Sequence, residues 1–464
     1  MSLSMTSASI MNSSFKSLAL ALALTPMALM AQTPDTSATT TSAVTQKEVY
    51  DLREKVSTLE GKATSAEEAF LETKTTVDKL AKIKVGGYIQ TQWQYGDSVG
   101  QATSGGGSFG PNSQERFLIR RARLKTTWQG STSKYVLELD ASPSGFSIKD
   151  INASISEPWL KAFTATAGVM DRPFGFEVGY SSSAIEVPER TRGAANLMPN
   201  EKDLGAQLEF VGNERLGFLE FFNLKAGVFT GMGATAAEND NEKDYIGRAG
   251  FLAPFYGLNL AVDGGFSTYM GKVTNTTTKV FETAMNADTL TWKAKSGQSK
   301  LDTYDRTLMG VDGQIYYDIP VIGGISLRGE YWWGKNPSSS SNSQFYAGDT
   351  NGVYLREVAS WYVMAVQNLG TQFQVAARYD VYDPNTEADG DDIGKKGSKL
   401  IASDVAFSTV ALALNYFWDD AVRFTAAYDI VTNEQVNSAA TSTLKNWTKD
   451  LNDNLFTLRM QVKF

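Results

Sequence analysis

Basic residues crowd into one short stretch of the sequence and could bind anions. Between positions 115 and 130, the basic side chains are Arg116, Arg120, Arg121, Arg123 and Lys125. Side chains of a β-strand alternate between two faces, so Arg121, Arg123 and Lys125 would share one face. Guanidinium groups match phosphate and carboxylate oxygens, and rows of Arg and Lys along a pore favour anions. The stretch therefore predicts an anion-binding wall, unless these residues pair with nearby carboxylates and only set the local electric field.

Two residue types that carry much of enzyme chemistry are missing. The 464 residues include no His and no Cys. This excludes histidine acid–base catalysis, Ser–His triads and imidazole metal sites. The 51 acidic residues are scattered and suggest no catalytic carboxylate pair. We therefore expect no enzyme, no cofactor and no metal site, and the lack of Cys suits a chain that crosses an oxidising periplasm.

The first residues are typical of a secretory signal peptide. Within 1–31 the only charge is Lys16, an apolar stretch covers 18–24, and a small residue ends the segment at Ala31. Residues 32–46 are rich in Thr, Ser and Ala, and we expect a flexible linker there. Loss of Lys16 with the signal would change the net charge from -8 to -9. An acidic total argues against nucleic acid as a partner.

Residues 47–83 show a heptad repeat. Its a and d positions are Val49, Leu52, Val56, Leu59, Ala63, Ala66, Phe70, Thr73, Val77 and Leu80. All except Thr73 are apolar, and the flanking positions carry Glu and Lys, which predicts a coiled coil and hence an oligomer. Because this segment precedes the first strand, we expect it in the periplasm. The alternative is an amphipathic helix that lies on the rest of the protein.

From Lys84 onward the sequence alternates like the strands of a barrel. At the C-terminus one face would carry Phe456, Leu458, Met460, Val462 and Phe464, and the other Thr457, Arg459, Gln461 and Lys463. Predicted strands begin near positions 84, 115, 132, 148, 161, 203, 217, 244, 257, 305, 323, 354, 371, 404, 421 and 453. Short connections alternate with long polar ones, as in outer-membrane barrels. Residues 84–464 therefore predict an all-β transmembrane β-barrel of about 16 antiparallel strands in the bacterial outer membrane.

Charged residues of these strands should face the lumen, because a charge on the lipid face costs about 2–4 kcal/mol at the bilayer midplane. The expected lumenal cations are Arg121, Arg123, Lys125, Lys225, Arg248, Arg306, Arg328, Arg378, Arg423 and Arg459. The expected lumenal anions are Glu138, Asp140, Asp150, Asp312, Glu330, Asp380 and Asp429. Arg378 lies two residues from Asp380, and Arg328 two residues from Glu330, so each pair should share a face and could form a bridge.

Two stretches resemble the phosphate-selective porin O and P family. One is Arg120-Arg121-Ala122-Arg123, and the other runs from Gly168 to Arg192 and includes Pro173-Phe174-Gly175 and Glu189-Arg190. The resemblance covers the second to the sixth predicted strand well, and later strands match only in general style. It implies a trimeric barrel of about sixteen strands whose third external loop folds inward to form a constriction.

The third external connection of the predicted barrel, after 97–114 and the shorter 142–147, covers 173–202. Together with the residue before it, it supplies the candidate constriction residues Arg172, Glu177, Glu186 and Glu189, and the candidate anion-binding residues Arg190 and Arg192. Lys225 and Arg248 on later strands complete the expected anion-binding set with Arg121, Arg123 and Lys125. Mixed charge suits a constriction that sets a transverse field, although an ordinary surface loop can also carry it.

We therefore predict an outer-membrane porin, a passive aqueous channel for small hydrophilic solutes with a phosphate-type preference for anions. A general or saccharide pore is the first alternative, since Trp332, Trp361 and Tyr316 could stack on sugar rings. A non-conducting structural or adhesive barrel is the second. The expected partners are a homotrimer, outer-membrane lipid and small anionic or neutral solutes.

Overall fold

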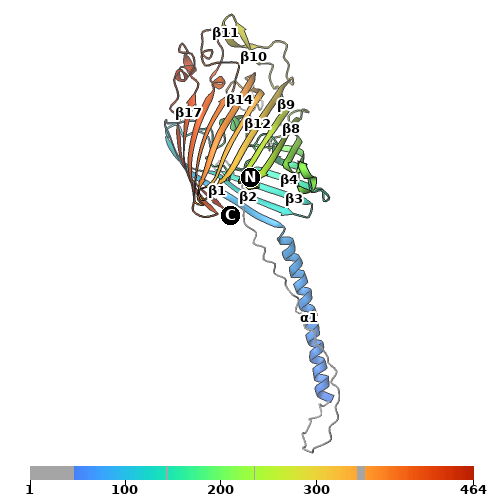
Figure 1. The fold of residues 1–464 in the computed structure, drawn as a ribbon. Coiled ribbons are helices and arrows are strands. Elements are labelled where there is room, and N and C mark those ends of the chain that lie inside the picture. Colours follow the sequence, from blue (N-terminus) through green and yellow to red (C-terminus); the bar gives the residue numbers. More distant parts are fainter. Residues whose placement is uncertain (1–45, 143–144, 235, 342–350) are drawn as a thin grey trace, which may run out of the picture. The chain divides into compact units, whose positions relative to one another are not determined.

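The computed structural model describes residues 46–142, 145–234, 236–341 and 351–464 (Figure 1). The predicted signal peptide and all but the last residue of the predicted linker lie outside these residues. The chain divides into two compact units, 1–81 and 82–464. None of the helices within the described residues has the length and apolar character that a membrane span requires.

The first unit contributes one long helix. Helix α1 (Gln46–Leu80) has 35 residues, with Glu48 in its first turn and Lys79 in its last turn. These charges complement the helix dipole at both ends. The helix includes all the predicted a and d positions, and it ends at Leu80, three residues before the end of the predicted segment 47–83.

The second unit is a closed antiparallel barrel. The strands of its first half are β1 (Ile83–Gly96), β2 (Glu115–Gln129), β3 (Ser133–Ser142), β4 (Gly145–Ser156), β5 (Phe163–Asp171), β6 (Lys202–Val211), β7 (Phe222–Phe229), β8 (Asp244–Phe255) and β9 (Leu260–Thr274). Those of its second half are β12 (Thr303–Ile319), β13 (Gly323–Ser338), β14 (Val353–Leu369), β15 (Phe373–Asp383), β16 (Phe407–Phe417), β17 (Val422–Asn433) and β18 (Leu455–Lys463). Strand β1 pairs with both β2 and β18, which closes the ring.

The described residues contain eighteen strands, and two of them, β10 (Val280–Asn286) and β11 (Thr289–Ala294), form a hairpin between β9 and β12. Because β9 pairs directly with β12, the barrel itself has sixteen strands. The predicted fold class and strand number are confirmed. The hairpin was not predicted and lies within a long connection.

Alternation decides which side chains point inward. On β18, Leu458 and Met460 are exposed on the outer face, whereas Thr457, Arg459 and Gln461 are buried on the inner face. A strand with an apolar outer face and a polar inner face is what a barrel in lipid requires. The alternation predicted for the C-terminus is therefore confirmed.

The connections alternate in length, as the sequence indicates. All sixteen barrel strands match a predicted start, with the largest shift at β7, which begins at Phe222 instead of near Gly217. Residues Glu214–Phe221 form a 3₁₀ helix there, and Gly217 has φ 56°. Glycine adopts a positive φ readily, which permits this helix. The helix lengthens the turn beyond what the alternation predicts.

Long connections beyond one end of the barrel pack on one another. Trp292 of β11 donates to Asp404 at 3.0 Å, and Arg356 of β14 donates to Asp404 at 2.8 Å. Arg356 and Asp404 are fully buried. An apolar cluster of Trp292, Ile393 and Val405 surrounds them. These connections therefore share a core of their own.

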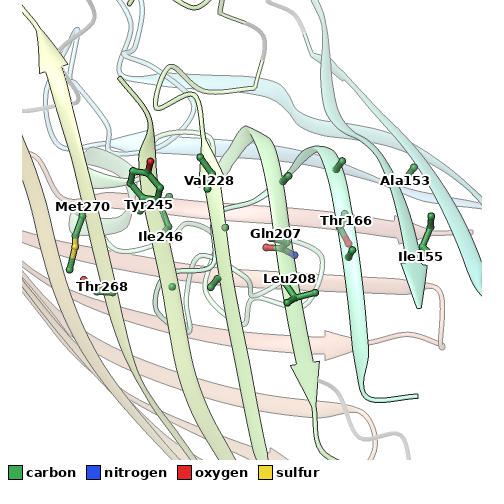
Figure 2. A pocket seen from close by; sticks show the side chains of 16 residues that line it. Ala153, Ile155, Thr166, Gln207, Leu208, Val228, Tyr245, Ile246, Thr268 and Met270 are labelled. Carbon is green, nitrogen blue, oxygen red and sulfur yellow. The ribbon is translucent and has the colours of Figure 1, made fainter. Parts of the chain in front are cut away.

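A shallow groove of about 700 Å³ crosses the outer face of β4–β9. Its small lining residues are Ala153, Ala165, Ala167, Ala206 and Ala226. Figure 2 shows the larger side chains of Leu208, Val228 and Tyr245 along the same groove. These three side chains are exposed on the outer face, so the groove is a feature of the outer wall of the barrel and not of its interior.

Candidate functional site

The basic stretch of the sequence lies on β2 and points into the barrel. Arg121 and Arg123 are buried on the inner face, and Lys125 follows them with a half-exposed side chain. The pairing with β1 shifts between Gln90 and Thr91, which leaves Arg120 as an extra residue in β2. Such a β-bulge puts two neighbouring residues on one face. Alternation alone would place Arg120 outside, but the structure brings it inside next to Arg121.

Strand β4 contains a second bulge. Glu138 pairs with Asp150 and Leu139 pairs with Ile148, so Lys149 is the extra residue. The charged groups that act on Lys149 include Glu201, Arg123 and Asp140. Lys149 therefore faces the interior beside Asp150. Sequence reasoning had placed Asp150 in the lumen but had not included Lys149.

Carboxylates neutralise the predicted ladder. Arg121 lies 3.1 Å from Glu189, and Arg123 lies 3.0 Å from Asp140. Lys125 lies 3.1 Å from Glu138, which comes from the directly paired position on β3. Lys225 and Arg248 are paired as well, with Glu209 at 2.9 Å and with Asp312 at 2.6 Å. The alternative stated for the ladder, in which its cations bridge to acids, is the arrangement that the structure has.

Glu189 binds three arginines from the barrel wall. Arg120 donates two hydrogen bonds to its carboxylate, both at 2.8 Å. Arg121 and Arg459 donate to the same carboxylate at 3.1 Å and 2.7 Å. Burial alone would raise the pKa of Glu189, but the guanidinium groups of Arg120, Arg121 and Arg459 hold this pKa well below its usual value. Glu189 therefore stays ionised.

The connection that carries Glu189 joins β5 to β6 and is called here the inner segment (172–201). Its backbone carbonyls accept hydrogen bonds from inner-face side chains, with Arg459 to Pro188 at 2.6 Å and Asn415 to Glu186 at 2.8 Å. Arg378 donates to the carbonyl of Glu189 at 2.8 Å. These donors belong to β15, β16 and β18, so the inner segment runs inside the barrel along this side.

The beginning of the inner segment is fixed to β13, which β14 separates from β15. The N–H groups of Phe176 and Glu177 donate to Glu330 of β13 at 2.8 Å and 3.1 Å. Gly175 has φ 65°, and a Cβ atom at this position would lie 2.0 Å from an oxygen of Glu330. Only glycine allows this close approach in a left-handed conformation.

Glu330 therefore has other partners than the sequence suggests. The expected bridge from Arg328 to Glu330 is wrong, because Arg328 binds Glu186 of the inner segment at 2.9 Å. Glu330 instead accepts the two N–H groups of the inner segment and the indole N–H of Trp332 at 2.7 Å. The expected bridge from Arg378 to Asp380 is confirmed, at 3.1 Å.

The remaining acids and bases of the inner segment bind mostly to one another. Glu177 accepts from the backbone N–H of Thr191 at 2.8 Å and from its hydroxyl at 2.6 Å. Thr191 in turn caps the short helix α2 (Arg192–Leu197). Arg190 lies 3.0 Å from Glu201. Burial alone would raise the pKa of Glu201, but the positive charge of Arg190 outweighs this effect and lowers the pKa to about 2.

Two arginines of the predicted site have different surroundings. Arg172 is 2 % exposed and lies 3.5 Å from Asp203. Arg192 has its guanidinium 3.9 Å from the centre of the Phe407 ring. The backbone N–H of Arg192 donates to Asp380 at 3.3 Å, but within the described part of the chain its guanidinium has no carboxylate within 4 Å. Arg192 therefore keeps a positive charge that no ion pair neutralises.

The aromatic residues proposed for sugar stacking do not form one surface. Trp332 is buried against Phe174, with ring centres 5.2 Å apart. Trp361 lies on the outer face against Tyr379. Trp332 and Tyr316 both face the interior, but the inner segment covers Trp332, whereas the ring of Tyr316 lies 5.8 Å from the guanidinium of Arg328.

A closed sixteen-stranded barrel with an apolar outer face, a charged inner face and an inner segment defines a channel protein of the outer membrane. The family model of the phosphate-selective porin O and P family matches residues 89–464. The chain belongs to this family and is a porin of the bacterial outer membrane, which forms a passive channel. No curated protein sequence matches the chain significantly.

Solved structures share the fold at low sequence identity. The chain resembles OprB of Pseudomonas putida at high pH with a TM-score of 0.53 and 10% identity, over 84% of this chain and 96% of that one. The anion-selective porin from Comamonas acidovorans matches with a TM-score of 0.47 and 13% identity, over 82% and 99%. The outer membrane channel DcaP of Acinetobacter baumannii matches with a TM-score of 0.48 and 11% identity, over 82% and 97%. At these identities the likeness to OprB shows the barrel fold alone.

Proposed function

We propose that this porin prefers anions, with phosphate among its solutes. The supporting observation is a recess of about 340 Å³ at the end of the barrel where β1 begins and β18 ends. Its charged lining residues are Lys84, Arg123, Lys125, Lys463 and Glu138. Within the described residues, Lys84 and Lys463 have no carboxylate within 4 Å. The recess therefore has an excess of positive charge, which attracts small anions.

The inner segment serves as the constriction in this proposal. It is bonded to β15 and β16 through the carbonyls of Glu189 and Glu186, and to β13 through the N–H groups that reach Glu330. Both signs of charge would then lie along the solute path, from Arg190, Arg192, Glu189 and Glu201. Because most of the arginines are paired, we expect a moderate anion preference and not an exclusive one.

The test removes the excess charge of the recess. Lys84→Gln with Lys463→Gln should lower the anion-to-cation permeability ratio, which the reversal potential across a salt gradient reports. Lys84→Arg with Lys463→Arg keeps both charges and should leave the ratio at the wild-type value. An equal ratio in the glutamine variant and the wild type would overturn the proposed origin of the preference.

A pore for neutral, ring-shaped solutes is the second candidate. Phe176 and Tyr180 of the inner segment stack with ring centres 5.3 Å apart, and Tyr180 lies 5.1 Å from the guanidinium of Arg328. Together with Tyr316 these rings could hold a sugar ring. Maltose should then interrupt the current of the wild-type pore, and Tyr316→Ala should reduce that effect. Maltose-independent current would dismiss this candidate.

We also propose a homotrimer whose α1 helices form a periplasmic coiled coil. The heptad positions of α1 support this arrangement, since Leu52, Leu59 and Leu80 are 58%, 63% and 61% exposed in the single chain. Apolar a and d positions become buried when helices of several chains pair. The apolar outer face of the barrel would meet outer-membrane lipid.

A further inference from the structure

The two bulges of the barrel wall have one property in common. Each bulge adds a single extra residue, Arg120 in β2 and Lys149 in β4, and in both cases the extra residue is a cation. In both cases the next residue, Arg121 or Asp150, is also charged and faces inward. The bulges therefore increase the number of charges on the inner face beyond what alternation permits.

The environment of Lys149 places its ammonium in the interior. The groups that act on it electrostatically are Glu201, Arg123, Asp140 and Arg121. Glu201 belongs to the inner segment, and the other three are inner-face residues of β2 and β3. Lys149 is half-buried, so water still reaches it. Its position is thus between the barrel wall and the inner segment.

Lys149 differs from the ladder in having no ion pair. Arg121, Arg123 and Lys125 each have a carboxylate within 3.1 Å. Within the described residues, no carboxylate lies within 4 Å of the Lys149 ammonium, and no hydrogen bond engages it.

The acids near Lys149 are engaged elsewhere. Glu201 is bonded to Arg190 at 3.0 Å, and Asp140 is bonded to Arg123 at 3.0 Å. Lys149 therefore keeps its three N–H donors and its unit charge available to a solute.

We propose that Lys149 contributes to the anion preference of this channel, beside the charge of the recess, by contacting anions as they pass the inner segment. A paired guanidinium has lost most of its field to its carboxylate, whereas a free ammonium in a narrow, partly buried site acts over a longer distance. In this arrangement Arg121, through Glu189, helps to position the inner segment, and Lys149 touches the solute. This inference rests on the proposed anion preference, since it names a further residue that contributes to that preference.

The experiment compares Lys149→Gln, Lys149→Arg and wild type in planar bilayers at about 0.1 M salt, where screening is moderate. Lys149→Gln should lower the anion-to-cation permeability ratio by roughly twofold or more, the factor for a unit charge acting across about 10 Å of water-like dielectric. Lys149→Arg keeps the positive charge and should leave the permeability ratio at the wild-type value. Lys293→Gln removes one exposed charge from β11, outside the barrel wall, and should leave the ratio unchanged.

Inorganic phosphate supplies a second readout. The phosphate concentration that halves the chloride current should rise in Lys149→Gln and stay at the wild-type value in Lys293→Gln. A merely structural role for Lys149 would lower the yield of folded barrel without this selective change.

The two proposals fail in different ways. A wild-type pore without anion preference would refute the proposed function. An anion-selective wild type with an equally selective Lys149→Gln variant would overturn only the role of Lys149.

Discussion

At the scale of single residues, pairing determines what each interior cation can do. Three guanidinium groups share the carboxylate of Glu189, and Glu186 binds Arg328. A buried cation that loses its partner is left with an uncompensated charge, which costs about 3–5 kcal/mol. The acids of the inner segment therefore hold the segment in place and at the same time reduce the positive field of the wall.

Glu189→Gln should free the charge of the three arginines while keeping the size of the side chain. We expect a higher anion-to-cation permeability ratio, together with a loss of about 3–5 kcal/mol of stability from the unpaired guanidinium groups. Reversal potentials and urea unfolding in detergent micelles measure the two effects. Glu214→Gln, an exposed residue of the turn before β7, is the matched control. A lower ratio in Glu189→Gln would contradict this reading of the pairs.

The inner-face residues show how far alternation predicts the site. It correctly placed Arg123 and Arg459 inside, because their strands are regular at those positions, and it also placed Arg121, which directly follows the bulge residue, inside. It missed Arg120 and Lys149, which are bulge residues. The signal was present, since two adjacent charges in a membrane strand cannot both avoid lipid without a bulge.

At the scale of elements, the inner segment depends on a few anchors. The Pro173-Phe174-Gly175 turn brings two N–H groups to Glu330, and Ser267 accepts the N–H of Gly175 at 2.9 Å. Phe174 and Leu197 are fully buried in a cluster with Trp332. Apolar packing and a buried carboxylate together keep this long connection inside the barrel.

Glu330→Ala removes the acceptor of both N–H groups and should loosen the beginning of the inner segment. We expect a larger single-channel conductance with more open-channel noise, because the segment would move within the lumen. Ser267→Ala loses one hydrogen bond, worth about 1 kcal/mol, and should change conductance much less. Identical conductance and noise in Glu330→Ala and wild type would argue that apolar packing alone holds the segment.

The strands were predictable, and their connections were less so. Strand starts follow from alternation and turn residues, and each barrel strand was found. The β10–β11 hairpin was missed because its pattern suits an exposed polar loop, and only contacts such as Trp292 with Asp404 give it a core. The predicted Arg328–Glu330 bridge was wrong because sequence spacing does not reveal that both side chains bind to the inner segment instead of to each other.

At the scale of the whole molecule, the barrel closes on itself through β1 and β18. This closure leaves no free strand edge, so the barrel can be stable without α1. Helix α1 has an apolar stripe that a single chain leaves exposed. The two units therefore have separate tasks in our account, with the barrel conducting and α1 joining three chains.

Deleting residues 32–83 should weaken the trimer and leave the barrel folded. The expected result is a lower dissociation temperature of the trimer in mild detergent, with unchanged β-sheet circular dichroism. Replacing Leu52 and Leu59 by Asp should have the same effect without a deletion, whereas Glu54→Asp, outside the a and d positions, should not. A truncated chain that no longer folds, or a trimer of wild-type stability, would refute this division of tasks.

The most direct test of the whole account is a planar-bilayer recording of the refolded wild-type protein under a salt gradient, with phosphate added afterwards. We predict stepwise conductance, a reversal potential on the anion-selective side and a current that phosphate reduces. Cation selectivity, or no conductance from a folded barrel, would contradict the account.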